Sequence, residues 1–176
     1  AEGWNSKSAI TTPATTGNTL SIQTGLLSVS KSTSYLSQNQ NPNTAGVKIG
    51  SFILQNNSSS EGVRVTTLQV AVTYGAGTSS TNLGALRTSE TTGSGATPVQ
   101  PATAAATATG TNTFSVDFTL APGATKTIDI LADSGSDNGV TATVITGLIV
   151  SSLGASSNIA VSQNGNGTVV SGQTIA

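Results

Sequence analysis

The chain has 176 residues, of which 7% are charged, whereas about 25% are charged in typical globular domains. It contains no His, Cys or Met, which excludes disulfides, thiolate nucleophiles, imidazole bases and metal ligation by those residues. The net charge of −1 is far from the basic balance that nucleic-acid binding requires. We therefore predict no catalytic residues, no enzymatic activity and no nucleic-acid partner.

Short runs with strand-like alternation follow one another along the chain, separated by turns rich in Gly, Asn, Ser and Pro. Ser and Thr make up 55 of the 176 residues, and β-branched Thr and Val favour sheets. The runs are Thr19–Thr24, Leu26–Lys31, Val47–Gln55, Val63–Tyr74, Thr113–Leu120, Thr125–Leu131, Val140–Leu153, Ile159–Ser162 and Thr168–Ile175. No window sustains helical spacing. The sequence predicts an all-β fold, an antiparallel β-sandwich (Ig-like or jelly-roll-like) of about eight to ten strands.

The run Val47–Gln55 is predicted to turn Val47, Ile49 and either Phe52 or Ile53 towards a core. In Val63–Tyr74, the apolar side chains change phase once, at the pair Thr66-Thr67. A change of phase by one residue moves the following side chains to the other face unless the strand bulges. We therefore predict a bulge or bend at this pair.

A tight turn is predicted at Ala121-Pro122-Gly123-Ala124, between two alternating strands. The first strand places Phe114, Val116, Phe118 and Leu120 inward, and the second places Ile128 and Ile130 inward. Asp117 and Asp129 then fall on the outward faces, where we expect solvent. The segment Ser89–Gly110 is dominated by Thr, Ala, Gly and Pro, and is predicted to be a long surface loop or irregular insertion, alternatively one carrying O-linked sugars.

The first residues form a separate unit, an N-terminal arm of residues 1–24 that precedes a sandwich domain of residues 25–176. Its apolar points of contact with another subunit are expected to be Trp4, Ile10, Leu20 and Ile22. In a lone domain such an arm hangs as a tail or covers an edge strand. In a filament it inserts as a strand into the next molecule, which is β-augmentation.

Ala1–Asn5 has neither a basic region nor an apolar core, so it is not an intact secretory signal. No run approaches the ~20 apolar residues of a membrane span. We expect a mature exported protein from which the signal peptide has been removed, located outside the cell or at its surface, although a trimmed chain would look the same.

A Gly-rich turn brings Asp133, Asp137 and Asn138 close in sequence. Carboxylate and amide oxygens suit Ca²⁺, but the spacing departs from that of an EF-hand loop. The favoured interpretation is a solvated loop, with a calcium site as the alternative. Glycosylation sequons start at Asn56, Asn57 and Asn166, all at predicted turns.

Lys48 lies inside a predicted strand, and Asp117 or Asp129 is expected near it. Such a lysine is also a candidate for an internal isopeptide bond with an Asn, for which an acid would serve as proton shuttle. A Ser–Lys dyad is equally open in a chain this rich in Ser. No pair of carboxylates is flanked by the aromatic residues that line sugar clefts.

The stretch from Leu26 to Ile175 resembles the Ig-like β-sandwich modules of secreted and surface proteins of bacteria. The residues that carry the resemblance are Leu27–Lys31, Val47–Gln55, Val63–Leu68, the turn motif Phe118–Ile128 and the final strand Val169–Ile175. The extended arm before the sandwich is similar in architecture to TasA-like biofilm fibres and archaeal bundling pili. This resemblance implies a homopolymer built by donor-strand complementation, with glycans or neighbouring filaments as further partners. The alternatives are an adhesive or carbohydrate-binding module of a larger surface protein, and an S-layer-type module.

Overall fold

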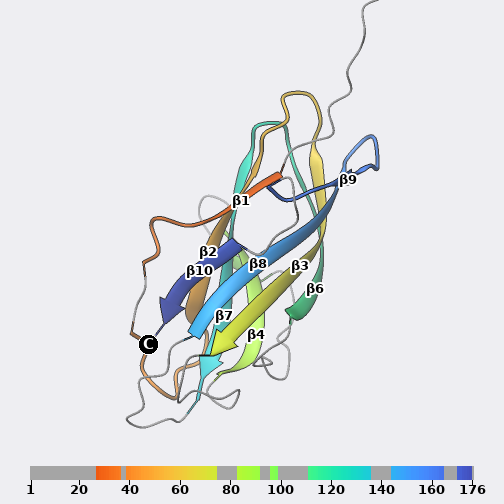
Figure 1. Ribbon diagram of the computed structural model, residues 1–176. Coiled ribbons are helices and arrows are strands. Elements are labelled where there is room, and N and C mark those ends of the chain that lie inside the picture. The colour runs from red at the N-terminus through yellow and green to blue at the C-terminus, as the bar shows by residue number, and fades with distance from the viewer. Residues whose placement is uncertain are drawn as a thin grey trace, which may run out of the picture.

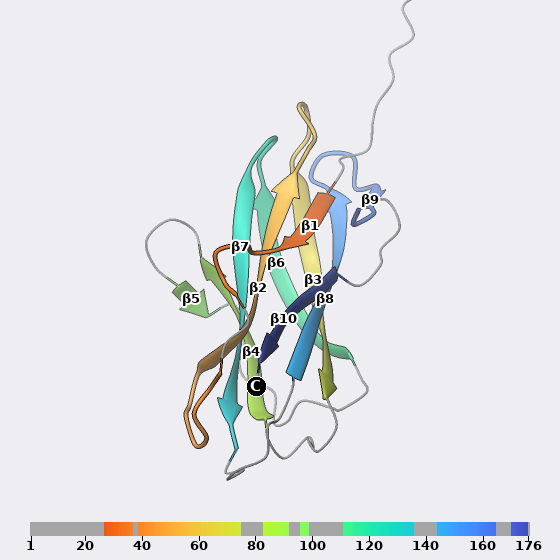
Figure 2. The same ribbon diagram turned by 60° about the vertical axis from the view of Figure 1, so that its left-hand side comes forward.

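The computed structural model describes residues 27–36, 39–74, 83–91, 96–98, 111–135, 144–164 and 170–175. Two antiparallel sheets pack face to face in it (Figures 1 and 2). Sheet A has the spatial order β1 (Leu27–Lys31), β2 (Val47–Asn56), β7 (Thr125–Ser134), β4 (Leu83–Thr91) and β5 (Ala96–Pro98). Sheet B has the order β10 (Val170–Ile175), β8 (Val144–Gly154), β3 (Val63–Tyr74) and β6 (Thr111–Leu120), and β9 (Ala160–Val161) pairs with the end of β8. The described residues contain no helix, so the predicted all-β sandwich is confirmed.

The core lies between the sheets and is filled by alternate side chains of both. Its largest fully buried apolar side chains are Phe52, Leu27, Ile49, Leu54, Leu68, Leu86, Ile128, Ile130, Leu148, Val63 and Val65. Each such side chain contributes about 1.5–3 kcal/mol relative to an exposed one. Of the two residues left open by the sequence, Phe52 enters the core, whereas Ile53 is only half-buried.

The predicted irregularity in β3 is confirmed. Val65 pairs with Ser152 of β8 and Thr67 pairs with Ser151, so Thr66 is the extra residue of a bulge. This insertion returns Leu68 to the core face that Val65 occupies, and both are fully buried. The strand thus keeps one apolar face along its length despite the change of phase in its sequence.

The turn between β6 and β7 is also confirmed. The amide of Ala124 donates to the carbonyl of Ala121 at 3.0 Å, and Gly123 has a φ of 71°. Pro122 before a left-handed glycine is the preference of a type II turn. Phe114, Val116 and Leu120 are buried and Phe118 is half-buried, as the alternation predicts.

β4 is a strand that the sequence pattern did not predict. Its buried residues Leu83 and Leu86 are three positions apart, because the pairing with β7 is irregular between Gly84 and Arg87. Ala85, inside this bulge, has a φ of 48°. The loop prediction for 89–110 is therefore wrong at 89–91, which end β4, and at Ala96–Pro98, which pair with them as β5. The rest of that segment and the arm of residues 1–24 lie outside the described residues.

Candidate functional site

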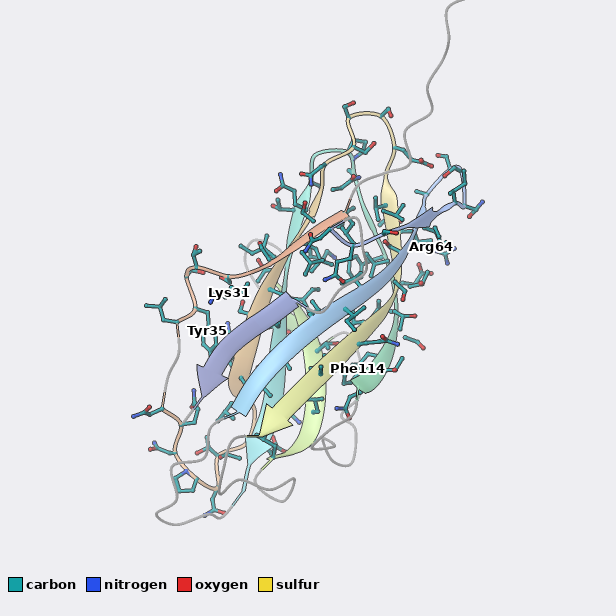
Figure 3. All side chains as sticks on the ribbon, viewed as in Figure 1. Lys31, Tyr35, Arg64 and Phe114 are labelled. Atoms are coloured by element: carbon teal, nitrogen blue, oxygen red, sulfur yellow. The ribbon has the colours of Figure 1, made fainter. Side chains whose placement is uncertain are left out.

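The two lateral sides of the sandwich are the candidate sites for assembly, because the sheets end there. On the β1 side, β1 of sheet A contacts β10 of sheet B. On the β6 side, β6 ends sheet B, and its Phe118 lies beside Lys126 of β7. Figure 3 shows Lys31 and Tyr35 on the β1 side, and Arg64 and Phe114 on the β6 side.

The outer edge of β1 is hydrogen-bonded by Asn164, which follows β9. The amide of Val29 donates to Asn164 Oδ1 at 2.9 Å, and Asn164 Nδ2 donates to the carbonyl of Val29 at 2.9 Å. The backbone amide of Asn164 also donates to the carbonyl of Leu27 at 2.8 Å. One asparagine thereby supplies the pairing that a neighbouring strand would give.

Gln163 makes the same kind of contact with sheet B. It is fully buried, its Oε1 accepts from the amide of Val150 at 2.6 Å, and its Nε2 donates to the carbonyl of Leu148 at 3.1 Å. Val150 lies between the stretch of β8 paired with β9, at Ser152 and Leu153, and the stretch paired with β10, which ends at Leu148. The side-chain amide of Gln163 therefore bonds the backbone of β8 where the pairing passes from β10 to β9.

The part of β2 that extends beyond β1 is protected by the segment that follows β1. The amide of Ser32 donates to the carbonyl of Ser51 at 2.8 Å, and the hydroxyl of Tyr35 donates to the carbonyl of Lys48. Tyr35 is itself buried, and the pKa of its hydroxyl is raised by that burial. The β1 side also ends on an exposed lysine, Lys31, of the type that discourages pairing at sheet edges.

The β6 side is different. β6 is ten residues long, and within the part of the chain that the structure describes it pairs with β3 alone. Among the described residues, the one hydrogen bond to its backbone from outside β3 is from Asn56 Nδ2 to the carbonyl of Leu120, at the end of the strand, at 3.2 Å. Long edge strands with free backbone groups are templates for pairing with another chain.

The outward residues of β6 are polar but carry little net charge. Thr113, Ser115 and Thr119 are exposed hydroxyl residues. The exposed Asp117 accepts two hydrogen bonds from Arg64 of β3, at 2.7 and 2.8 Å, which lower the pKa of its carboxyl. The charge of the carboxylate is therefore balanced within the same sheet.

Phe118 marks the place where the core comes closest to the surface on this side. Its ring is half-buried, and the ammonium of Lys126 lies 4.2 Å from the ring centroid. Among the described residues, the pairing of β4 with β7 ends at Thr91 and Thr127, one residue after Lys126. The stem of Lys126 and its cation–π contact cover the aromatic ring.

Asp129 was predicted to face solvent, and this is wrong. It does point outward, opposite Ser51 in the register, but it is 6% exposed. Lys48 Nζ lies 2.7 Å from its Oδ2, and the hydroxyl of Ser51 donates to its Oδ1 at 2.6 Å. The expected proximity of Lys48 and Asp129 is thus confirmed.

Asp117, the other acid expected near Lys48, instead pairs with Arg64 in the other sheet. The ring of Tyr35 lies 5.3 Å from Lys48 Nζ. Lys48 is thus held by a carboxylate on one side and an aromatic ring on the other.

The residues named for calcium are only partly described. Asp133 Oδ1 accepts from the amide of Gly46 at 2.7 Å and from Arg87 Nη2 at 2.6 Å, and these two contacts lower the pKa of its carboxyl. Asp137 and Asn138 lie outside the described residues, and no group of three or more acidic, His or Cys side chains gathers in the described part. The guanidinium of Arg87 thus occupies a position next to Asp133 that a bound Ca²⁺ would need.

The sequons differ in accessibility. Asn56 is fully buried, and its Nδ2 donates to the carbonyls of Glu61, Leu120 and Ala121 at 2.9, 3.2 and 3.1 Å. The prediction of a glycan at Asn56 is therefore wrong for the folded domain, since that nitrogen joins β2 to the end of β6. Asn57 is exposed and donates to Ser28 Oγ, so its glycosylation stays a prediction.

Other named residues lie outside the described part of the chain, namely Asn166, Trp4, Ile10, Leu20 and Ile22. Sequence reasoning missed Gln163 and Asn164, the residues that close the β1 side. The available signal was weak, because Gln and Asn before a Gly are typical of an ordinary turn.

No protein-family model matches this chain, and no curated protein matches it. Among the residues that the structure describes, no helix is long and apolar enough to cross a membrane.

Proposed function

We propose that this chain is the structural subunit of an extracellular filament, assembled non-covalently by donor-strand complementation. The N-terminal arm of one subunit adds as a strand to the sandwich of the next. The observation that carries the proposal is the neutral ten-residue edge of β6, in contrast to β1, where both backbone groups of Val29 are bonded to Asn164. Head-to-tail addition is a contact that does not close on itself, so it extends into a filament.

The distribution of charge supports this proposal. Six cations and seven acids are all that the chain carries, and three ion pairs form among the residues that the structure describes. They are Lys48 with Asp129, Arg64 with Asp117, and Arg87 with Asp133. Exposed Thr and Ser occupy strand positions that usually carry charge. Copies of such a domain approach one another with little electrostatic repulsion.

Sugar binding has less support. The described aromatic side chains Tyr35, Phe52 and Phe114 are buried, and Phe118 is half-buried beneath Lys126. A carbohydrate surface generally presents rings for stacking. An S-layer-type module differs from the filament subunit only in how its copies are arranged.

The test is electron microscopy of the purified full chain and of a variant lacking residues 1–24. The full chain is expected to form fibres in negative stain, and the truncated chain to remain monomeric with a cooperative thermal transition. A truncated chain that polymerises as the full chain does would show that the arm is not the connector. A full chain that stays monomeric at all concentrations would overturn the filament itself.

A further inference from the structure

We infer that the outer edge of β6 is the docking edge, and that its occupant is the segment Thr19–Thr24 of a second copy. This inference rests on the proposed function and specifies which of the two sides receives the arm. The edge is described by the structure, and the occupant is the one uncharged, strand-like run of the arm, with Leu20 and Ile22 at alternate positions.

The β1 side offers an added strand fewer acceptor and donor groups than β6 does. The amide and the carbonyl of Val29 are both bonded to the side chain of Asn164, and β10, which ends sheet B on this side, is six residues long and contacts β1 and β2. The amide of Val150 and the carbonyl of Leu148 in β8 are bonded to Gln163. An incoming strand would have to displace these contacts, whereas along β6 no described strand has to move.

The length of the chain indicates that the occupant comes from another copy. Thr24 is three residues before Leu27, so their Cα atoms lie at most about 11 Å apart. Leu27 pairs with Asn56, whose Nδ2 donates to the carbonyl of Leu120, so the start of β1 lies near the Leu120 end of β6. Addition antiparallel to β6, the direction of every described strand pair, would place Thr24 at the Thr111 end, and a strand of ten residues spans about 30 Å. The arm of the same molecule therefore cannot add to β6 as an antiparallel strand.

The side-chain pattern of the arm matches that of β6. Strand addition would place Leu20 and Ile22 on the core side, next to the alternating Phe114, Val116 and Phe118. The half-buried ring of Phe118 would gain an apolar neighbour there. Ser21 and Gln23 would face outward beside the hydroxyl residues of β6, and neither strand brings an unpaired charge to the contact.

Cysteine pairs test this edge on a chain that has no cysteine of its own. Chains carrying Ser21→Cys are mixed with isotope-labelled chains carrying Thr113→Cys, Ser115→Cys or Thr119→Cys, assembled, and oxidised with glutathione disulfide. Labelled-to-unlabelled disulfides are then quantified by mass spectrometry. At least one of the three β6 positions is expected to link at least ~10-fold more than Ser30→Cys, an exposed position of β1. Ile22→Cys, which faces the core in this arrangement, should not link to Ser115→Cys.

The outcomes distinguish two claims: that β6 is the docking edge, and that the chain forms a filament. Fibres that link at Ser30→Cys, or at none of the β6 positions, overturn the β6 edge and leave the filament standing. Linked pairs without fibres support the β6 edge and overturn the filament. Absence of both fibres and links overturns both.

A charge variant gives an independent readout that does not need oxidation. Ser115→Lys places an ammonium on the exposed face of the docking edge, and Ser30→Lys is its matched control on β1. Fibre mass in sedimentation is expected to fall at least ~10-fold for Ser115→Lys only, with unchanged thermal transitions for both variants. Equal assembly of the two variants would overturn the assignment of the β6 edge.

Discussion

The β1 side and the β6 side of this sandwich treat their free backbone groups in opposite ways. On the β1 side, the side-chain amides of Gln163 and Asn164 bond backbone groups of β8, at Val150 and Leu148, and of β1, at Val29. On the β6 side, a ten-residue strand has a partner along one edge only among the described residues, apart from a single amide of Asn56 at its end. The difference shows that side-chain amides can bond the backbone groups of a sheet edge in this fold, and that they do so on the β1 side.

The largest loss of stability is expected from removing the buried side-chain amide of Gln163 on the β1 side. Gln163→Met keeps a similar volume but leaves the amide of Val150 and the carbonyl of Leu148 without partners. We expect the free energy of unfolding to fall by about 2–4 kcal/mol, since each unsatisfied buried group costs about 1–3 kcal/mol. Urea denaturation measures this change. Gln55→Met, at an exposed position of β2, is the matched control, and a loss below about 1 kcal/mol for Gln163→Met would contradict the role given to its amide.

A milder change opens the edge of β1. Asn164 has a φ of 47°, a conformation that glycine also adopts, so Asn164→Gly removes the side-chain amide without straining the backbone. We expect a loss of about 1–2 kcal/mol in the free energy of unfolding. Amide hydrogen exchange should accelerate at Val29 and remain unchanged at Val65 in the core. Unchanged protection of Val29 would show that Asn164 does not protect this edge.

The smallest expected effect is a pH dependence of stability, which should differ between the β6 side and the β1 side. Asp117, beside the β6 edge, has a pKa lowered from 3.8 by hydrogen bonds from Arg64, whereas the amides of the β1 side do not titrate in this range. A carboxyl with a lowered folded-state pKa contributes stability above its unfolded pKa, and this contribution is lost as the pH falls through the folded value.

Asp117→Asn should therefore be slightly less stable than the native chain at neutral pH, and this deficit should shrink as the pH falls below 3.8, measured by urea midpoints across that range. Gln163→Met, by contrast, should show a deficit that does not change over the same range. A deficit of Asp117→Asn that does not shrink at low pH would mean that the ion pair is not its cause.

The strands that alternate cleanly could be predicted from the sequence, and even the irregular β3 revealed its bulge through the step in phase at Thr66. β4 could not, because its bulge at Ala85 places Leu83 and Leu86 on the core face three residues apart, a spacing that a regular strand does not give. Periodicity detects a regular backbone. It fails where a single residue in the left-handed region resets the faces.

The candidate site was less predictable than the fold, since alternation reports which way a side chain points but not what covers it. The direction of Asp129 followed from its neighbours Ile128 and Ile130, whereas its burial depends on residues distant in sequence such as Ser51. The roles of Gln163 and Asn164 depend likewise on which strand edges remain unpaired once both sheets have formed. That information is contained in the topology and not in any local pattern.

The hydrogen bonds between Asn164 and Val29 join residues 135 positions apart, and this separation affects the order in which the domain is made. β1 leaves the ribosome long before the residue that protects it, by about 7–27 s at a synthesis rate of ~5–20 residues per second. Contacts so distant in sequence also carry a high entropy of loop closure, so they are expected to form late in folding. During that interval β1 lacks the contacts of Asn164, and the exposed Lys31 is the residue of β1 of the type that disfavours pairing with another chain.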